Sequence, residues 1–243
     1  MNDNFDYLRN LFNDIKARRY IESCYYDSGA AGKLFENLIN KQLDNKCFAD
    51  FFGIELKVSS PHSSYPITLF SSFPKIYNKS FEDSISYLIT NYGYTCDNGI
   101  KKLSINVKSN KIKYCKSGYG FMLKVSYKWK KIYLCIFYKN KIICTKFYWS
   151  FEQLYEIVEN KLKNLAYISY MQKNINEKKY INYCDMIFYR FKKPIFLIKA
   201  IENGIISINF NIVLYSLGNI RYHGVNFVIY YNDFSFIYEK INK

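Results

Sequence analysis

The stretch DFFGIELKVSS, from Asp50 to Ser60, places two carboxylates and a lysine around one short apolar strand. Side chains on an extended strand alternate between its faces, so Glu55 and Lys57 are predicted to leave the same face. Asp50 lies upstream of Gly53, a residue that allows the chain to bend sharply. These three opposed charges are therefore expected to form one cluster.

The cluster contains the residue types that hydrolysis of a phosphodiester requires. Two carboxylates supply hard oxygen ligands for a divalent cation, which neutralises phosphate charge and lowers the pKa of a bound water. A lysine beside them can orient that water, accept its proton or stabilise a pentacovalent phosphate. The competing interpretation is a solvated Glu–Lys pair on an exposed strand, and the motif alone leaves both open.

Length and composition favour a folded protein of one large domain or two packed lobes. The chain has 243 residues, of which 49% are hydrophobic and 23% charged. Its N-terminus is polar and it has no apolar stretch near the ~20 residues that span a bilayer, so a cytoplasmic protein without membrane contact is expected. Seven scattered cysteines, with His62 and His223 as the histidines, argue against zinc and for reduced thiols.

The formal charge of +15 is unevenly distributed along the chain. Residues 1–60 are almost neutral, whereas the segment between Asp97 and Glu152 has thirteen lysines, interleaved aromatics and no acidic residue. Such a segment attracts a polyanion, which points to nucleic acid. Codon bias toward lysine is the competing explanation, but it does not account for the missing acids.

Apolar periodicity and capping residues predict a mixed α/β protein. Helices are expected at 3–19, 29–43, from Ser80 to about 91, from Ser150 to about 165, and between Pro194 and Gly204. Strands are expected through 51–60 and 65–73, as an antiparallel meander over about 100–148, at 165–172 and 180–190, and on either side of a polar loop at 216–224. Trp149 is expected in the core.

The order of these motifs resembles the PD-(D/E)xK nuclease core, and more specifically its MutH-like branch. GAAGKLFE contains Gly29-x-x-Gly32-x-x-x-Glu36, which precedes Asp50 and the Glu-x-Lys strand as in that branch. The segments at 147–169, 176–183 and 200–212 look like parts of the MvaI/BcnI-type restriction endonucleases. The similarity covers about residues 29 to 229.

This resemblance implies a restriction-endonuclease-like fold, with a mixed sheet flanked by helices and a DNA-recognition lobe. Asp50 and Glu55 match the metal-binding carboxylates, Lys57 the catalytic lysine and Glu36 the assisting helix carboxylate. The implied activity is that of a type II enzyme that binds double-stranded DNA as a monomer and cuts its strands sequentially. Mg²⁺ is the implied cofactor, with Mn²⁺ as a substitute, and a cognate DNA methyltransferase is expected in the host but not as a stable subunit.

The resemblance also predicts how DNA is read. Residues 1–165 are expected to form mainly the catalytic lobe, including the basic meander, and 166–243 mainly the recognition lobe. The loop GNIRYHG matches a His-Gly loop of the family at His223 and Gly224, and His223 is a predicted DNA contact. Arg221, Tyr222, Asn211 and Lys33 are further predicted DNA contacts. Arg221, Tyr222 and Asn211 depart from the family pattern, so a C·G-rich target is not transferred.

Two other functions remain open. One is a MutH-like strand-specific nickase that works in repair. The other is a non-catalytic basic protein that binds nucleic acid, in which the acidic cluster is structural.

Overall fold

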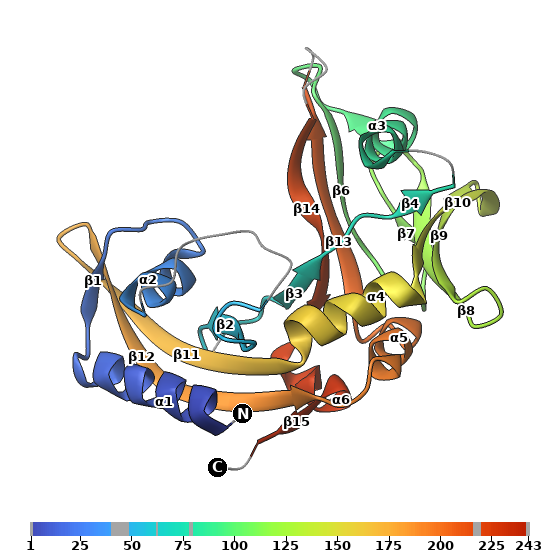
Figure 1. Cartoon of the computed structure of the whole chain (residues 1–243). Helices are drawn as coiled ribbons and strands as arrows, with labels where there is room; N and C mark the ends of the chain where they lie inside the picture. Colours follow the sequence, from blue (N-terminus) through green and yellow to red (C-terminus); the bar gives the residue numbers. More distant parts are fainter. Residues whose placement is uncertain (1, 40–48, 62, 78–79, 216–219, 242–243) are drawn as a thin grey trace. The chain divides into compact units, whose positions relative to one another are not determined.

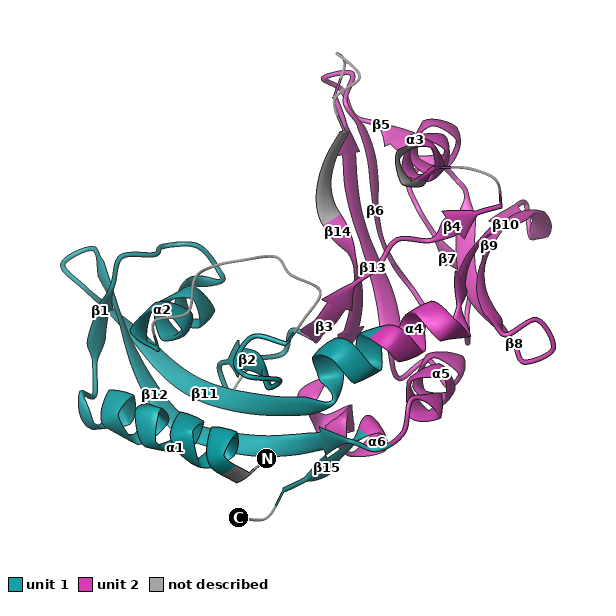
Figure 2. Cartoon of the chain, viewed as in Figure 1, with its two compact units in different colours: residues 1–65, 157–192, 238–243 teal, residues 66–156, 193–237 magenta. Residues whose placement is uncertain are grey.

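The computed structural model describes residues 2–39, 49–61, 63–77, 80–215 and 220–241 as a mixed α/β protein with sheets flanked by helices (Figure 1). The chain divides into two compact units, each built from separate segments (Figure 2). Unit 1 contains Met1–Tyr65, Ile157–Lys192 and Tyr238–Lys243, and unit 2 contains Pro66–Glu156 and Lys193–Ile237.

Unit 1 is built on one mixed sheet. Its elements are α1 (Asn2–Ala17), β1 (Ile21–Ser23), α2 (Ala30–Leu38), β2 (Glu55–Ser59), the π-helical turn η1 (Val158–Leu162), β11 (Asn164–Ile175), β12 (Lys178–Phe191) and β15 (Tyr238–Lys240). The strand order is β1-β12-β11-β2, and β15 also pairs with β12. The described pairings are antiparallel except that of β2 with β11, which is parallel.

Both helices of unit 1 pack into one apolar core with the sheet. Phe12 of α1 and Phe35 of α2 are buried in the same cluster as Ala166, Ile168 and Tyr183 of the strands. Leu56 of β2 belongs to this cluster as well, and Val58 packs against it. Because side chains alternate along a strand, Glu55 and Lys57 lie on the other face of β2.

Unit 2 contains two antiparallel sheets. One has the order β4-β10-β9-β8-β7 and the other β3-β14-β13-β6-β5. Their strands are β3 (Ile67–Ser71), β4 (Lys75–Ile76), β5 (Tyr94–Thr95), β6 (Lys101–Val107), β7 (Lys113–Tyr114), β8 (Gly120–Ser126), β9 (Lys131–Tyr138), β10 (Lys141–Ser150), β13 (Ser207–Leu214) and β14 (Ile220–Ile229).

The helices of this region are α3 (Phe81–Tyr92), α4 (Phe151–Ile157), α5 (Ile195–Glu202), the 3-10 turn η2 (Tyr231–Asp233) and α6 (Phe234–Ile237). Trp149 of β10 is fully buried, as predicted, and its ring centroid lies 5.6 Å from that of Phe227 in β14. Its indole N–H donates to the Ser72 carbonyl at 3.1 Å. Trp149 therefore joins the two sheets of unit 2.

The capping predictions are confirmed. The Ser80 hydroxyl accepts the Asp83 amide at the start of α3, and the Ser150 hydroxyl accepts the Gln153 amide at the start of α4. In the second helix, the predicted residues 40–43 lie outside the described residues.

Three expectations need correction. The predicted meander is divided between sheets, because β6 pairs with β13 rather than with β8. The helix after Ser150 changes to π-helical geometry at Val158 and has ended before Asn164, where β11 begins. Of the polar loop predicted at 216–224, residues 220–224 instead lie in β14, which pairs with β13, and residues 216–219 lie outside the described residues.

The compact units also differ from the predicted division at residues 165 and 166, which falls inside β11. The strands of the basic meander lie in unit 2, whereas Asp50, Glu55 and Lys57 lie in unit 1. Which unit recognises DNA stays a prediction.

Of the helices that the structure describes, none has both the length and the apolar character that crossing a membrane requires.

Candidate active site

A tight turn brings Asp50 next to β2. Phe51 and Ile54 exchange backbone hydrogen bonds of 2.9 and 2.8 Å, with Phe52 and Gly53 between them at φ values of 44° and 83°. Two successive positive φ values are typical of a type I′ turn, in which glycine is favoured. Phe51 and Ile54 are both buried and anchor the turn in the core. Asp50 and Glu55 are consequently neighbours across this turn.

The side chains of the turn and strand hold one another in place. The Leu56 amide donates to Oδ2 of Asp50 at 2.9 Å, which fixes that carboxylate against β2. Nζ of Lys57 donates to Oε1 of Glu55 at 2.7 Å, as two residues on one face of a strand can. The geometric expectation of a shared face for Glu55 and Lys57 is confirmed.

Glu55 is an unusual carboxylate because it is almost entirely buried, at 1% exposure. Burial is the largest influence on its pKa and raises it, and the negative charge of Asp50 acts in the same direction. The positive charges of Lys57 and Lys161 oppose this rise. Oε2 of Glu55 is buried and, within the described part of the chain, has no hydrogen-bond partner.

These features fit a hard divalent cation. Asp50 and Glu55 offer carboxylate oxygens, and the unsatisfied Oε2 is a ligand atom for which the described residues supply no donor. Among the residues described, no three His, Cys, Asp or Glu side chains are close enough to hold one ion. Glu36, in α2 and partly exposed, therefore does not complete such a group with Asp50 and Glu55, and its assisting role stays a prediction.

Lys161 is a residue of the site that sequence reasoning missed. Its Nζ lies 3.6 Å from Oε1 of Glu55, and its side chain is 22% exposed. It belongs to η1, which precedes β11, the parallel neighbour of β2. Nothing in the local pattern signals this contact, because it joins segments that are far apart in the sequence.

A model of the MvaI/BcnI restriction endonuclease family matches residues 9–238, nearly the whole chain. This chain belongs to the MvaI/BcnI restriction endonuclease family. The family resemblance and the enzyme class predicted from the sequence are thereby confirmed.

Two solved structures of MvaI are similar to this member of the family. The complex of restriction endonuclease MvaI with a cognate DNA substrate matches with a TM-score of 0.89 and 27% identity, over 99% of this chain and 98% of MvaI. MvaI in the absence of DNA matches with a TM-score of 0.64, at the same identity and coverage. No curated protein sequence matches this chain.

The segment predicted to read DNA in this family member is a strand rather than a loop. The backbones of Arg221 and Tyr222 pair with Val213 and Ile212 in β13, and His223 follows in the same strand. The pairing of β13 with β14 has a register shift between Phe210 and Ile212, which leaves the exposed Asn211 at an irregular position. Bulges of this kind redirect a side chain.

Gly224 explains why this strand tolerates the irregularity. Its φ of +105° is strained for other residues, and a Cβ there would lie 2.5 Å from Oδ1 of Asn226. The match of Gly224 to the family loop therefore has a structural reason. Base or phosphate contacts by Asn211, Arg221, Tyr222 and His223 stay predictions.

Two other sequence predictions have different outcomes. Lys33 forms a surface ion pair, with Nζ at 2.6 Å from Oδ2 of Asp27, and its contact with DNA stays a prediction. His62, expected to be an ordinary loop histidine, lies outside the described residues.

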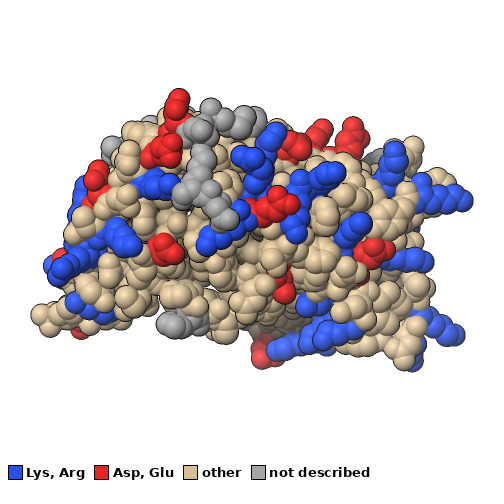
Figure 3. All heavy atoms as spheres, turned by 90° about the horizontal axis from the view of Figure 1, so that it is seen from below, with Lys and Arg blue, Asp and Glu red and all other residues tan. Residues whose placement is uncertain are grey.

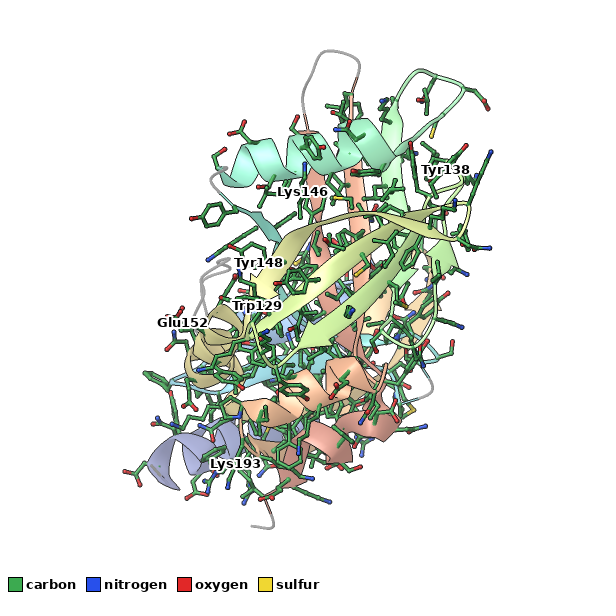
Figure 4. The ribbon with its side chains drawn as sticks, turned by 90° about the vertical axis from the view of Figure 1, so that its right-hand side faces the viewer. Trp129, Tyr138, Lys146, Tyr148, Glu152 and Lys193 are labelled. Atoms are coloured by element: carbon green, nitrogen blue, oxygen red, sulfur yellow. The ribbon has the colours of Figure 1, made fainter. Side chains whose placement is uncertain are left out.

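The basic meander presents cations beside aromatic rings on the surface of β9 and β10. Nζ of Lys131 lies 3.9 Å from the ring centroid of Tyr148, and Lys146 is exposed two residues before Tyr148. Figure 4 shows Lys146 and Tyr148 along this side, with Trp129 at the turn before β9. Phe147 and Trp149 point instead into the core. Cations beside exposed rings are a typical nucleic-acid-binding surface.

Proposed function

We propose that this protein is a type II restriction endonuclease that hydrolyses phosphodiester bonds of double-stranded DNA at a specific sequence, with Mg²⁺ as cofactor. The observation that carries the proposal is the cluster of Asp50, Glu55 and Lys57, in which one buried carboxylate oxygen has no partner among the described residues. Membership of the MvaI/BcnI family supports the reaction class. The similarity to MvaI in complex with cognate DNA supports DNA as the substrate.

Asp50 and Glu55 would hold the ion through their carboxylate oxygens, and Mn²⁺ would substitute for Mg²⁺ because it accepts the same ligands. The ion, when bound, supplies positive charge at the phosphate and a water of lowered pKa. The Leu56 amide keeps Asp50 in place, and Lys57 keeps Oε1 of Glu55 occupied, so that Oε2 stays available. The ammonium of Lys57 also stabilises negative charge that develops on the phosphate.

Kinship with the family further supports a monomer that cuts the two strands in turn, with a separate methyltransferase that protects host DNA. Unit 2, which contains the cationic aromatic surface, Asn211 and the strand with Arg221, is proposed to read the DNA. The target sequence is left open because Arg221 and Tyr222 depart from the family pattern.

The test is incubation of the purified protein with unmethylated plasmid and phage DNA and Mg²⁺. Discrete fragments are expected, with open circles appearing before linear plasmid if strands are cut in turn. Lys57→Ala and Asp50→Ala should abolish cleavage because both groups act at the phosphate. Binding of both variants to DNA in Ca²⁺ should be retained. Size-exclusion chromatography should give the mass of one chain.

Other outcomes would favour other functions. Conversion of supercoiled plasmid to open circles that never become linear would support a nickase. DNA that stays intact with many templates and with both Mg²⁺ and Mn²⁺ would overturn the proposal and favour a non-catalytic DNA-binding protein.

A further inference from the structure

The connection between α4 and β11 has an unusual backbone geometry next to the candidate active site. From Val158 to Leu162 the chain forms a π-helical turn, a geometry that occurs mostly as single turns and frequently at functional sites. Val158 and Leu162 are buried, so the turn is anchored from within. Between them, Glu159 and Asn160 are exposed and Lys161 is partly buried.

This turn and the first residue of β11 contact the segment from Ala49 to Glu55 at three points. The Asn160 carbonyl accepts the amide of Ala49, the neighbour of Asp50, at 3.2 Å. Nζ of Lys161 lies 3.6 Å from Oε1 of Glu55. Just beyond the turn, the Asn164 side chain donates to the Gly53 carbonyl at 3.3 Å. The turn thus braces both carboxylate-bearing ends of the Asp50–Glu55 segment.

The two lysines near Glu55 act on the same oxygen atom. Lys57 at 2.7 Å and Lys161 at 3.6 Å both approach Oε1, and both side chains are largely buried. Oε2 is left without a hydrogen-bond partner among the described residues. The positive charges of both lysines favour the ionised form of Glu55, whereas its burial and the negative charge of Asp50 oppose it.

Lys163 is a natural reference for Lys161. It lies two residues further along and forms an ordinary i, i+4 surface pair, with Nζ at 3.1 Å from Oε2 of Glu159. Its side chain is 60% exposed, against 22% for Lys161. Exposed pairs of this kind are screened by water and contribute little.

We propose that Lys161 is a positioning residue of the active site, which holds Glu55 through Oε1 and lowers the affinity of the DNA-free site for a divalent cation. This inference rests on the proposed function, because it treats Asp50 and Glu55 as the metal-binding carboxylates. A buried cation close to a ligand oxygen repels an incoming metal ion, and at the same time it keeps the second oxygen directed outward.

The direct test is titration of the DNA-free protein with Ca²⁺ by isothermal calorimetry. Lys161→Met should lower the half-saturating Ca²⁺ concentration roughly tenfold, because one repelling charge near the ion is removed. Lys163→Met should match the wild type, and Lys161→Arg should stay close to it, since the charge is kept. Equal half-saturation in Lys161→Met and Lys163→Met would overturn the inference.

Cleavage at saturating Mg²⁺ provides the second measurement. Lys161→Met should cut DNA on the order of 10- to 100-fold more slowly than the wild type, although it binds Ca²⁺ more tightly, because loss of a residue that orients a metal ligand typically costs this much activity. Lys161→Arg should recover part of the cleavage rate. If Lys161→Met does not fold, as judged by circular dichroism, Lys161→Gln replaces it with the same expected results. Cleavage as fast as that of Lys163→Met would count against the inference.

The proposed function and the role of Lys161 would fail in different ways. If wild-type protein cuts no DNA and Asp50→Ala leaves its Ca²⁺ titration unchanged, the proposed function fails and this inference fails with it. If wild-type protein cuts DNA, Asp50→Ala abolishes cutting, and Lys161→Met behaves as Lys163→Met, the role of Lys161 alone is disproved.

Discussion

Glu55 determines the chemistry of the candidate site because it is a carboxylate held out of water. Its face of β2 is opposite the face that packs with α1 and α2, and that placement follows from simple alternation along the strand. Burial would normally keep such a group protonated, and Lys57 and Lys161 offset that tendency. The pKa nevertheless stays raised, so a bound divalent cation would favour the ionised form that its site needs.

The raised pKa of Glu55 predicts a specific pH dependence of stability. The folded protein holds the Glu55 proton more firmly than the unfolded chain does, so this contribution to stability is complete below the ordinary pKa of 4.5. It is lost as the pH rises through the higher pKa of the folded state. In the absence of divalent metal, the unfolding free energy of the wild type minus that of Glu55→Gln should therefore decline as the pH rises from about 4.5.

Urea unfolding of both proteins at successive pH values measures this difference. Glu159→Gln, at the surface on η1, is the control and should show no comparable decline. A difference that grows with pH would contradict the raised pKa of Glu55.

At the scale of elements, the turn from Phe51 to Ile54 sets the spacing of the two carboxylates. Its two hydrogen bonds and the positive φ values of Phe52 and Gly53 leave little freedom for Asp50 relative to β2. The parallel pairing of β2 with β11 then places the turn and β2 beside η1. The geometry of the site is therefore a property of backbone elements as much as of side chains.

Glycine substitutions test the turn. Gly53→Ala should lower the free energy of unfolding by about 1 kcal/mol, because a side chain is strained at φ +83° although no atom of the described structure lies within 4 Å of the added Cβ. Gly32→Ala, inside α2 and equally open, should instead raise it by about 0.5–1 kcal/mol.

Urea unfolding of both variants measures the two changes. The two changes in unfolding free energy are expected to have opposite signs, because an added Cβ has open space at both glycines and only the backbone conformation differs between them. A Gly53→Ala protein as stable as the wild type would show that the left-handed conformation of Gly53 is not required.

At the scale of the whole molecule, the excess of positive charge is the dominant physical property. Lys and Arg number 35 against 20 Asp and Glu, and Figure 3 shows one face on which basic side chains outnumber acidic ones. In the sequence the imbalance is concentrated in the acid-free segment that forms β6 to β10 of unit 2. Long-range attraction to phosphate is the expected consequence.

This charge predicts a strong effect of salt on DNA binding. If about six phosphates are neutralised, affinity should fall roughly a thousandfold between 50 and 200 mM salt. Fluorescence anisotropy with duplex DNA and Ca²⁺ measures the slope of log affinity against log salt.

Replacement of Lys131 and Lys146 by Gln should make that slope shallower by up to about two. Lys178→Gln and Glu22→Gln together remove an exposed ion pair without changing net charge and provide the control. An unchanged slope in the Lys131 and Lys146 variant would exclude this surface from phosphate contact.

Local patterns in the sequence determined a large part of this protein. The apolar spacing in residues 3–19 predicted α1, Ser80 and Ser150 marked helix starts, and the two-residue step from Glu55 to Lys57 placed both on one face. Each of these depends on contacts between residues a few positions apart, so sequence order is sufficient. The ordered set of motifs also indicated the MvaI/BcnI family.

Tertiary structure alone decided how distant segments meet. Lys161 approaches Glu55 because β11 pairs with β2 and because the helix before it ends in a π-helical turn, neither of which has a local signature. Arg221 and Tyr222 lie in a strand although their composition is polar, because their backbones pair with β13. Spacing along the chain encodes periodicity, whereas the free energy of pairing and burial depends on residues far apart in sequence, so those contacts become visible only in the folded protein.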